Sequence, residues 1–102
     1  MACRIVWSPE AVEDVESIAE YIARDSPYYA RAVVAKMLGF ARSLTEFPAV
    51  GRIVPEYDDK KIRERIIYSY RMIYRIDGQN ITVVAVIHGR SMLEPLVDER
   101  LR

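Results

Sequence analysis

Two serine-proline pairs, Ser8-Pro9 and Ser26-Pro27, constrain the first half of this chain more than any other feature. Serine caps the free N–H groups of a helix's first turn, and proline suits its first position because it has no N–H to leave unpaired. Apolar residues follow each pair at the helical period. The pattern predicts a helix over 9–24 and a longer one over 27–47. The short connection between them predicts an antiparallel hairpin.

The rest of the chain alternates in polarity and is rich in β-branched and aromatic residues, which is typical of strands. Asp77-Gly78 is a hairpin turn between two of these segments. The segment 48–61, with its prolines, glycine and adjacent acids, is predicted to be a loop. The short charged tail that begins at Arg90 is predicted to add one turn of helix. The four predicted strands are 3–7, 62–67, 70–76 and 81–88.

A sheet needs its apolar face covered, and the helical hairpin is the cover that the sequence offers. The expected fold class is therefore α+β, with two layers: an N-terminal strand and a helical hairpin packed on a mainly antiparallel four-stranded sheet. The 102 residues suit a single domain over 1–102. The predicted core contains Trp7, Ile18, Ile22, Val34, Leu38, Met72, Tyr74 and Val83 or its neighbour Val84.

Composition excludes several classes of protein. The apolar residues form no run long enough for a membrane span or a signal peptide, so we expect a soluble, cytoplasmic protein with no membrane partner. Cys3 is the only cysteine, which excludes an intrachain disulfide, and it has no neighbouring zinc ligands. We expect a buried, reduced thiol, and neither metal nor cofactor.

The net charge is zero, but basic residues gather between Lys60 and Arg75, where Glu64 is the single acid. Alternation over 70–76 places Tyr70, Met72, Tyr74 and Ile76 on a packed face, and Arg71, Ile73 and Arg75 on a charged one. Arg75 alone suits a solvated side chain. Arg63 and Arg65 lie on the strand before Arg71, and Arg90 follows the next strand, so several guanidinium groups are expected to converge on a surface that suits a phosphate or a carboxylate. The candidate binding residues are Lys60, Lys61, Arg63, Arg65, Arg71, Arg75 and Arg90.

His88 is the only histidine, and it precedes a glycine at the end of a predicted strand. A half-buried imidazole satisfied by backbone groups is one interpretation. A general base is the other, and it requires a reacting hydroxyl within reach. The acids of the first helix suit its solvent face, and no paired-carboxylate site, phosphate loop or catalytic triad is present.

Five segments in order resemble the RelE/ParE toxin superfamily, and in particular its ParE-like branch. They begin with Trp7-Ser8-Pro9-Glu10-Ala11 and the helix up to Ile22, followed by Leu44-Thr45-Glu46-Phe47-Pro48 with Gly51-Arg52. The strand segments Ile62-Arg63-Glu64, Tyr70-Arg71-Met72-Ile73-Tyr74-Arg75 and Val86-Ile87-His88-Gly89-Arg90 complete the pattern. The resemblance covers nearly the whole chain.

The resemblance implies a growth-arresting toxin of a type II toxin-antitoxin (plasmid stabilisation) system, covered by the flexible C-terminal segment of a cognate antitoxin. ParE-like members inhibit DNA gyrase and are not hydrolases. RelE-like members cleave mRNA on the ribosome with basic residues at positions that match Arg71 and Arg90, and many have an acid-base group in the tail. The tail here has no Tyr, His or Lys, which favours gyrase inhibition. A nuclease would use Arg71, His88 and Arg90.

Overall fold

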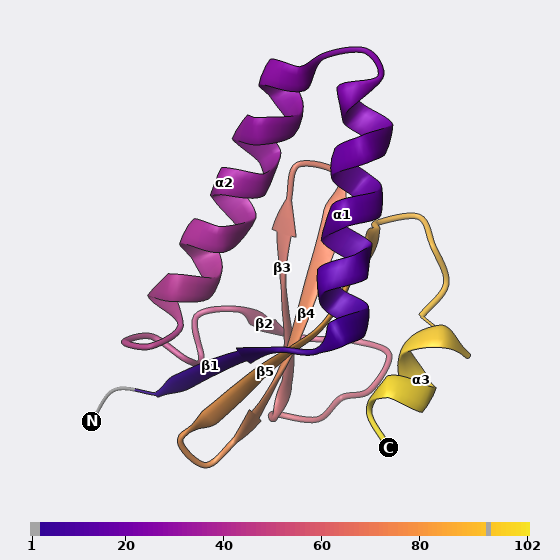
Figure 1. Ribbon diagram of the computed structural model, residues 1–102. Helices are drawn as coiled ribbons and strands as arrows, with labels where there is room; N and C mark the ends of the chain where they lie inside the picture. Colours follow the sequence, from indigo (N-terminus) through magenta and orange to yellow (C-terminus); the bar gives the residue numbers. More distant parts are fainter. Residues whose placement is uncertain (1–2, 94) are drawn as a thin grey trace.

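The computed structural model describes residues 3–93 and 95–102. The α+β class and the packing of a helical hairpin on a sheet are confirmed (Figure 1). No helix in the described ranges is long and apolar enough to cross a membrane. The elements are β1 (Arg4–Trp7), α1 (Pro9–Ala23), α2 (Pro27–Ser43), β2 (Arg52–Ile53), β3 (Ile62–Ile67), β4 (Tyr70–Asp77), β5 (Asn80–His88) and α3 (Leu96–Arg100).

The sheet has five strands in the order β1-β5-β4-β3-β2, not the four that the sequence predicts. The additional strand is β2, two residues long, which pairs with β3 inside the segment 48–61 that was predicted to be a loop. β1 runs parallel to β5, and the other pairs are antiparallel. Ile73 pairs with Ala85 and Tyr74 with Val83, so Val84 is an extra residue in β5; the alternation of side chains changes there in β5, while β4 keeps the predicted alternation.

Both predicted helix starts are confirmed, because the hydroxyls of Ser8 and Ser26 each accept a backbone N–H at 3.1 Å. The second helix, however, ends at Ser43 and not at Phe47. The hydroxyl of Thr45 donates to the carbonyl of Arg42, and a turn follows that brings the chain to Pro48. Local side-chain hydrogen bonds of this kind compete with the helical pattern.

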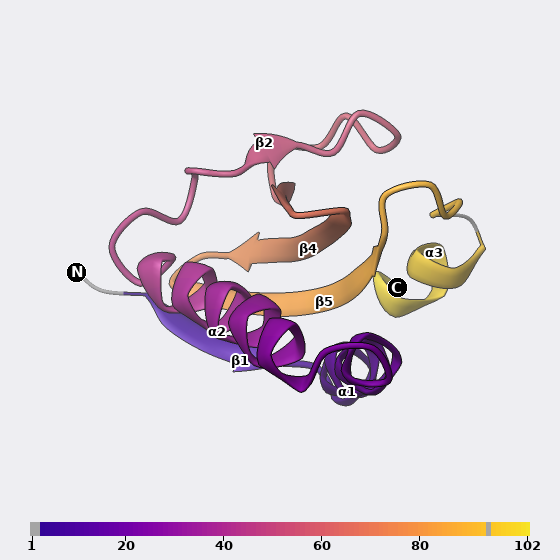
Figure 2. The ribbon, with the colours of Figure 1, turned by 90° about the horizontal axis from the view of Figure 1, so that it is seen from above.

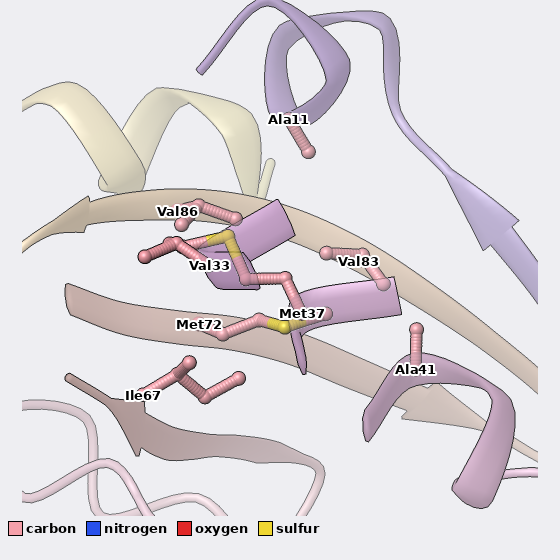
Figure 3. Packing of buried hydrophobic residues seen from close by; sticks show 8 residues of the cluster. All are labelled: Ala11, Val33, Met37, Ala41, Ile67, Met72, Val83 and Val86. Carbon is pink, nitrogen blue, oxygen red and sulfur yellow. The ribbon is translucent and has the colours of Figure 1, made fainter. Parts of the chain in front are cut away.

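The main core lies between the hairpin and one face of the sheet, where side chains of α1, α2 and three strands interdigitate (Figure 3). From α2, Val33 and Met37 are fully buried. Leu38 was predicted to lie in this core, but it is 40% exposed, because it points to the flank of the hairpin. Of the other predicted core residues, Met72, Tyr74, Val83 and Val84 are buried, while Trp7, Ile18, Ile22 and Val34 are partly buried.

The opposite face of the sheet is also covered, although the sequence predicts that it carries charge. β2 and the loop after it lie on this side of β4 and β5, away from α1 and α2 (Figure 2). Val54 of that loop and Val97 of α3 are fully buried in a second cluster that includes Ile73. The predicted turn of helix in the tail is thus confirmed as α3. It packs on the sheet, so apolar residues of β4 are buried on both faces.

Candidate functional site

The predicted basic cluster is divided between the two faces of the sheet. Arg65 pairs in register with Met72 of the hairpin-facing core, and its guanidinium lies 5.4 Å from the ring centroid of Phe40 in α2. Arg71 lies on the opposite face, where it contacts Glu64. The structure therefore does not bring these arginines together on one surface, because adjacent residues of paired strands alternate between faces.

Arg71 is the centre of an ion-pair network. It is 7% exposed, and its Nε donates to Oε1 of the fully buried Glu64 carboxylate at 2.6 Å. Its two terminal nitrogens donate to the two carboxylate oxygens of Glu56 at 2.8 and 2.9 Å, which is the bidentate geometry that guanidinium favours. Arg52 of β2 contacts the other oxygen of Glu64 at 2.6 Å. All three nitrogens of Arg71 thus already bind carboxylates of the chain itself.

The network fixes the ionisation of its members. Hydrogen bonds from Arg71 lower the pKa of Glu56 from 4.5 to about 2, against a smaller opposing effect of burial. The hydrogen bonds with Glu56 in turn raise the pKa of Arg71 above its usual value. Glu56 is therefore an ionised carboxylate at neutral pH, and its affinity for a proton is too low for an efficient general base.

Acid is expected to weaken this network. The pKa of Glu56 is lower in the folded chain than in the unfolded one, so its contribution to stability is present above about pH 4.5 and is lost as pH falls towards 2. Because 39% of the Glu56 side chain is exposed, we expect only about 1 kcal/mol at pH 7. Urea unfolding of the wild type and Glu56→Gln should differ at pH 7 and converge near pH 2. The control Glu46→Gln, at an exposed glutamate, should show no such pH-dependent difference in stability from the wild type.

His88 and Arg90 lie at the exposed end of β5. Nδ1 of His88 accepts the backbone N–H of Arg90 at 3.1 Å, and the imidazole and the Tyr70 ring form a T-shaped contact with their centroids 5.7 Å apart. The predicted backbone hydrogen bond is present, but the residue is exposed and not half-buried. Since Nδ1 accepts, the neutral imidazole carries its proton on Nε2, which is the nitrogen left to meet a partner molecule.

Two of the other candidate binding residues, Arg63 and Arg75, stabilise nearby loops and chain ends. Arg63 donates from Nη1 to the carbonyls of Ala49 and Gly51, and so fastens the loop before β2. Arg75 pairs with Asp77 at 2.8 Å, and it also donates to the carbonyl of Leu101. Lys60 and Lys61 are exposed on the loop before β3. Their binding roles remain predictions, and Lys60, Lys61, Arg65 and Arg90 are the exposed members of the set.

Another ion pair, which the sequence did not indicate, joins three elements. Arg100 of α3 contacts Asp14 of α1 at 2.6 Å and donates to the carbonyl of Val84. Asp14 also accepts the backbone N–H of Val86 at 3.0 Å. β1 ends at Trp7, and within residues 3–93 and 95–102 no strand pairs with the edge of β5 beyond that point. Asp14 and Arg100 therefore hydrogen-bond to backbone groups of this edge that would otherwise be free to pair with an added strand.

This fold matches that of known toxins. A family model described as "ParE toxin of type II toxin-antitoxin system, parDE" matches residues 5–93. The chain belongs to this family. It is thus a toxin of a type II toxin-antitoxin system in the RelE/ParE superfamily, as the sequence motifs indicated.

Two relatives of this ParE-family chain are also named as toxins. It is 32% identical to Y4kP of Sinorhizobium fredii, named as a candidate toxin, over 86% of this chain and 90% of that protein. It is 26% identical to "Toxin RelE2" of Caulobacter vibrioides over 87% of this chain and 98% of that protein. A solved structure, "Chromosomal ParDE TA system from P. aeruginosa", superposes with a TM-score of 0.69 at 17% identity, covering 85% and 96% of the two chains. That likeness shows the shared fold.

The sequence pattern did not identify Glu56 and Glu64 as partners of Arg71. A signal for Glu64 was present, because it is the single acid in a basic segment. It also lies two residues after Ile62, and so on the same strand face, which becomes buried. A buried carboxylate requires a cation beside it. Glu56 gave no comparable signal, since it lies in an irregular loop whose path depends on tertiary contacts.

Proposed function

We propose that this toxin inhibits DNA gyrase without being a hydrolase, and that a cognate antitoxin neutralises it. The match to a ParE family model supports the first part, because gyrase inhibition is the activity that resemblance to the ParE-like branch implies. The name of the superposed structure, a ParDE toxin-antitoxin system, supports the second.

The occupied guanidinium of Arg71 is the observation that favours a non-hydrolytic activity. Cleaving RNA through its 2′-hydroxyl requires a proton acceptor, a proton donor and stabilisation of the charged phosphorane. Arg71 is already bound by two carboxylates, and Glu56 holds a pKa too low to accept a proton efficiently. The tail, with no Tyr, His or Lys, supplies no replacement.

Ribosome-dependent RNA cleavage is the alternative function. His88 and Arg90 are adjacent, exposed and linked by a hydrogen bond, so an imidazole and a guanidinium could meet one phosphate together. The relative named RelE2 also favours keeping this alternative. It requires a second proton-transfer group, which ribosomal RNA or the substrate itself would have to provide.

Two surfaces suit an antitoxin. The flank of the helical hairpin carries an almost wholly apolar groove of about 560 Å³, lined by small residues of α1 and by Val34 and Leu38 of α2. An amphipathic helix is the usual occupant of such a groove. β1 and β2 are the two edge strands of the sheet, where an extended segment could add. The antitoxin's acids would meet the exposed Lys60, Lys61 and Arg90 rather than Arg71.

Purified toxin is expected to block supercoiling by gyrase at low salt, while mRNA on translating ribosomes remains intact. Arg90→Ala should raise the inhibitory concentration by roughly tenfold or more, because a guanidinium that pairs with an anion at a desolvated interface contributes about 2 kcal/mol. Arg42→Ala, which removes an exposed arginine near the end of α2, is the matched control and should leave inhibition unchanged.

The nuclease alternative makes the opposite forecast. Cleavage of ribosome-bound mRNA by the wild-type chain, lost in His88→Gln with an unchanged melting temperature, would contradict gyrase inhibition as the activity. It would give His88 a role in proton transfer. If His88→Gln leaves supercoiling inhibition as strong as in the wild type, His88 contributes only to local packing.

A further inference from the structure

A tyrosine-rich cleft of about 640 Å³ opens between the helical hairpin and the sheet, near the turn that joins α1 to α2. Its apolar floor includes Ile18 and Ile22 of α1 and Val86 of β5. The basic strand residues discussed above do not line it, although His88 does, at its rim. The volume is that of a small-molecule or peptide site, and it exceeds the space that one side chain fills.

Four tyrosines form the walls: Tyr21 and Tyr29 from the hairpin, Tyr68 from the β3–β4 turn, and Tyr70 from the start of β4. Tyr29 meets Tyr68 edge-on at 5.6 Å, which ties the two walls together. Tyr21 and Tyr68 are 66% and 48% exposed, so much of their surface is open to a ligand. Burial raises the pKa of Tyr70, so its phenol is neutral at physiological pH.

The charge of the cleft favours a cation. Its described lining contains the carboxylates of Asp14 and Asp25 but no lysine or arginine. Asp14 is paired with Arg100, whereas no ion pair within 4.0 Å involves Asp25 in the described part of the chain. The Asp25 carboxylate is therefore available to a guanidinium, which would also meet electron-rich ring faces.

Two cations of the chain already use rings from this wall. Lys36 lies 5.9 Å from the centroid of Tyr68, and Arg24 lies 5.9 Å from that of Tyr21. Neither cation lines the cleft. These contacts show that the rings are placed where cations can reach them, and the interior of the cleft has the carboxylate in addition.

We propose that this cleft binds an arginine side chain of the cognate antitoxin, with a neighbouring aliphatic residue on the apolar floor. This inference rests on the proposed antitoxin partner. Arginine suits the site better than lysine, because a planar guanidinium stacks on a tyrosine ring and still donates to Asp25 from its edge. The antitoxin would then bind the toxin at two points of opposite charge: its acids at the exposed basic residues, and its arginine in the cleft.

The first test uses small probes and NMR of the isotope-labelled toxin. N-acetyl-leucyl-arginine amide should shift the amide signals of Tyr68, Ser69 and Val86. N-acetyl-leucyl-norleucine amide and uridine monophosphate should bind about tenfold more weakly, because neither presents a cation. Asp25→Asn and Tyr29→Leu should each weaken the arginine probe several-fold. Tyr28→Leu is the matched control, since this neighbour is 76% exposed and does not line the cleft; it should change nothing.

Three outcomes would each overturn the inference. If the norleucine probe binds as tightly as the arginine probe, the site is apolar, and if the nucleotide binds more tightly than the arginine probe, the cleft is a nucleic-acid platform. If the arginine probe does not bind, the cleft is no binding site. The second test measures the affinity of the antitoxin for the same variants. A wild-type complex that Asp25→Asn and Tyr29→Leu leave equally tight overturns the cleft inference alone. If the wild-type toxin forms no antitoxin complex, the proposed partner fails as well.

Discussion

Replacing Arg71 by methionine is expected to lower the free energy of unfolding by about 3–5 kcal/mol, enough to unfold a marginally stable domain of this size. The substitution keeps the aliphatic volume and removes the charge. It leaves the Glu64 carboxylate, which is fully buried, with Arg52 as its remaining partner, and the Arg52 side chain is 62% exposed. An incompletely paired buried carboxylate is costly because no water replaces the lost donor.

Urea unfolding followed by the fluorescence of Trp7 would measure this loss. Arg75→Met is the matched control, because Arg75 lies on the same strand but its side chain is 31% exposed and pairs with the exposed Asp77. It should cost about 1 kcal/mol or less. The double variant Arg71→Met/Glu64→Leu should recover much of the stability, since it removes the buried Glu64 carboxylate together with its partner Arg71. If the double variant were as unstable as Arg71→Met, the loss would arise from packing and not from the buried carboxylate.

The helices and most strands could be predicted because their signals are local. Ser8-Pro9 and Ser26-Pro27 mark helix starts by side-chain capping, which depends on neighbouring residues alone. Asp77-Gly78 marks a turn for the same reason, and Gly78 has a positive φ of 60°. β2 could not be predicted, because two residues carry no periodic pattern. It exists only because Arg52 and Ile53 meet β3 in the folded chain.

The site was harder to predict, because it depends on which residues cover the second face of the sheet. Alternation correctly placed Arg71 and Met72 on opposite faces of the sheet. It did not reveal that Val54 and Val97 would bury the face that carries Arg71. Once the face is buried, Arg71 needs carboxylates, and these come from β3 and from the loop before it. Exposure, and with it the availability of an arginine to a target, is a tertiary property that a single strand pattern does not contain.

The last prediction concerns α3, which covers part of the second face of the sheet. Val97→Asp is expected to detach α3 and to cost on the order of 3 kcal/mol, because it places a carboxylate in an apolar cluster. Val97 is fully buried against the sheet, and α3 is also held by Arg100 on Asp14 and by the hydrogen bond from Tyr57 to Asp98. Losing the helix would expose Ile73 and its neighbours. Urea unfolding would measure the cost, and amide hydrogen exchange would locate it.

Leu96→Asp is the control for this prediction, since it introduces the same carboxylate one residue earlier on the same helix. Leu96 is 50% exposed, so its substitution should change stability by no more than about 0.5 kcal/mol. In Val97→Asp, exchange should accelerate at α3 and at Val54 while the hairpin-facing core stays protected. Equal effects of the two substitutions would mean that α3 does not pack on the sheet in solution. The apolar residues that cluster with Val97 on the second face would then form an exposed surface.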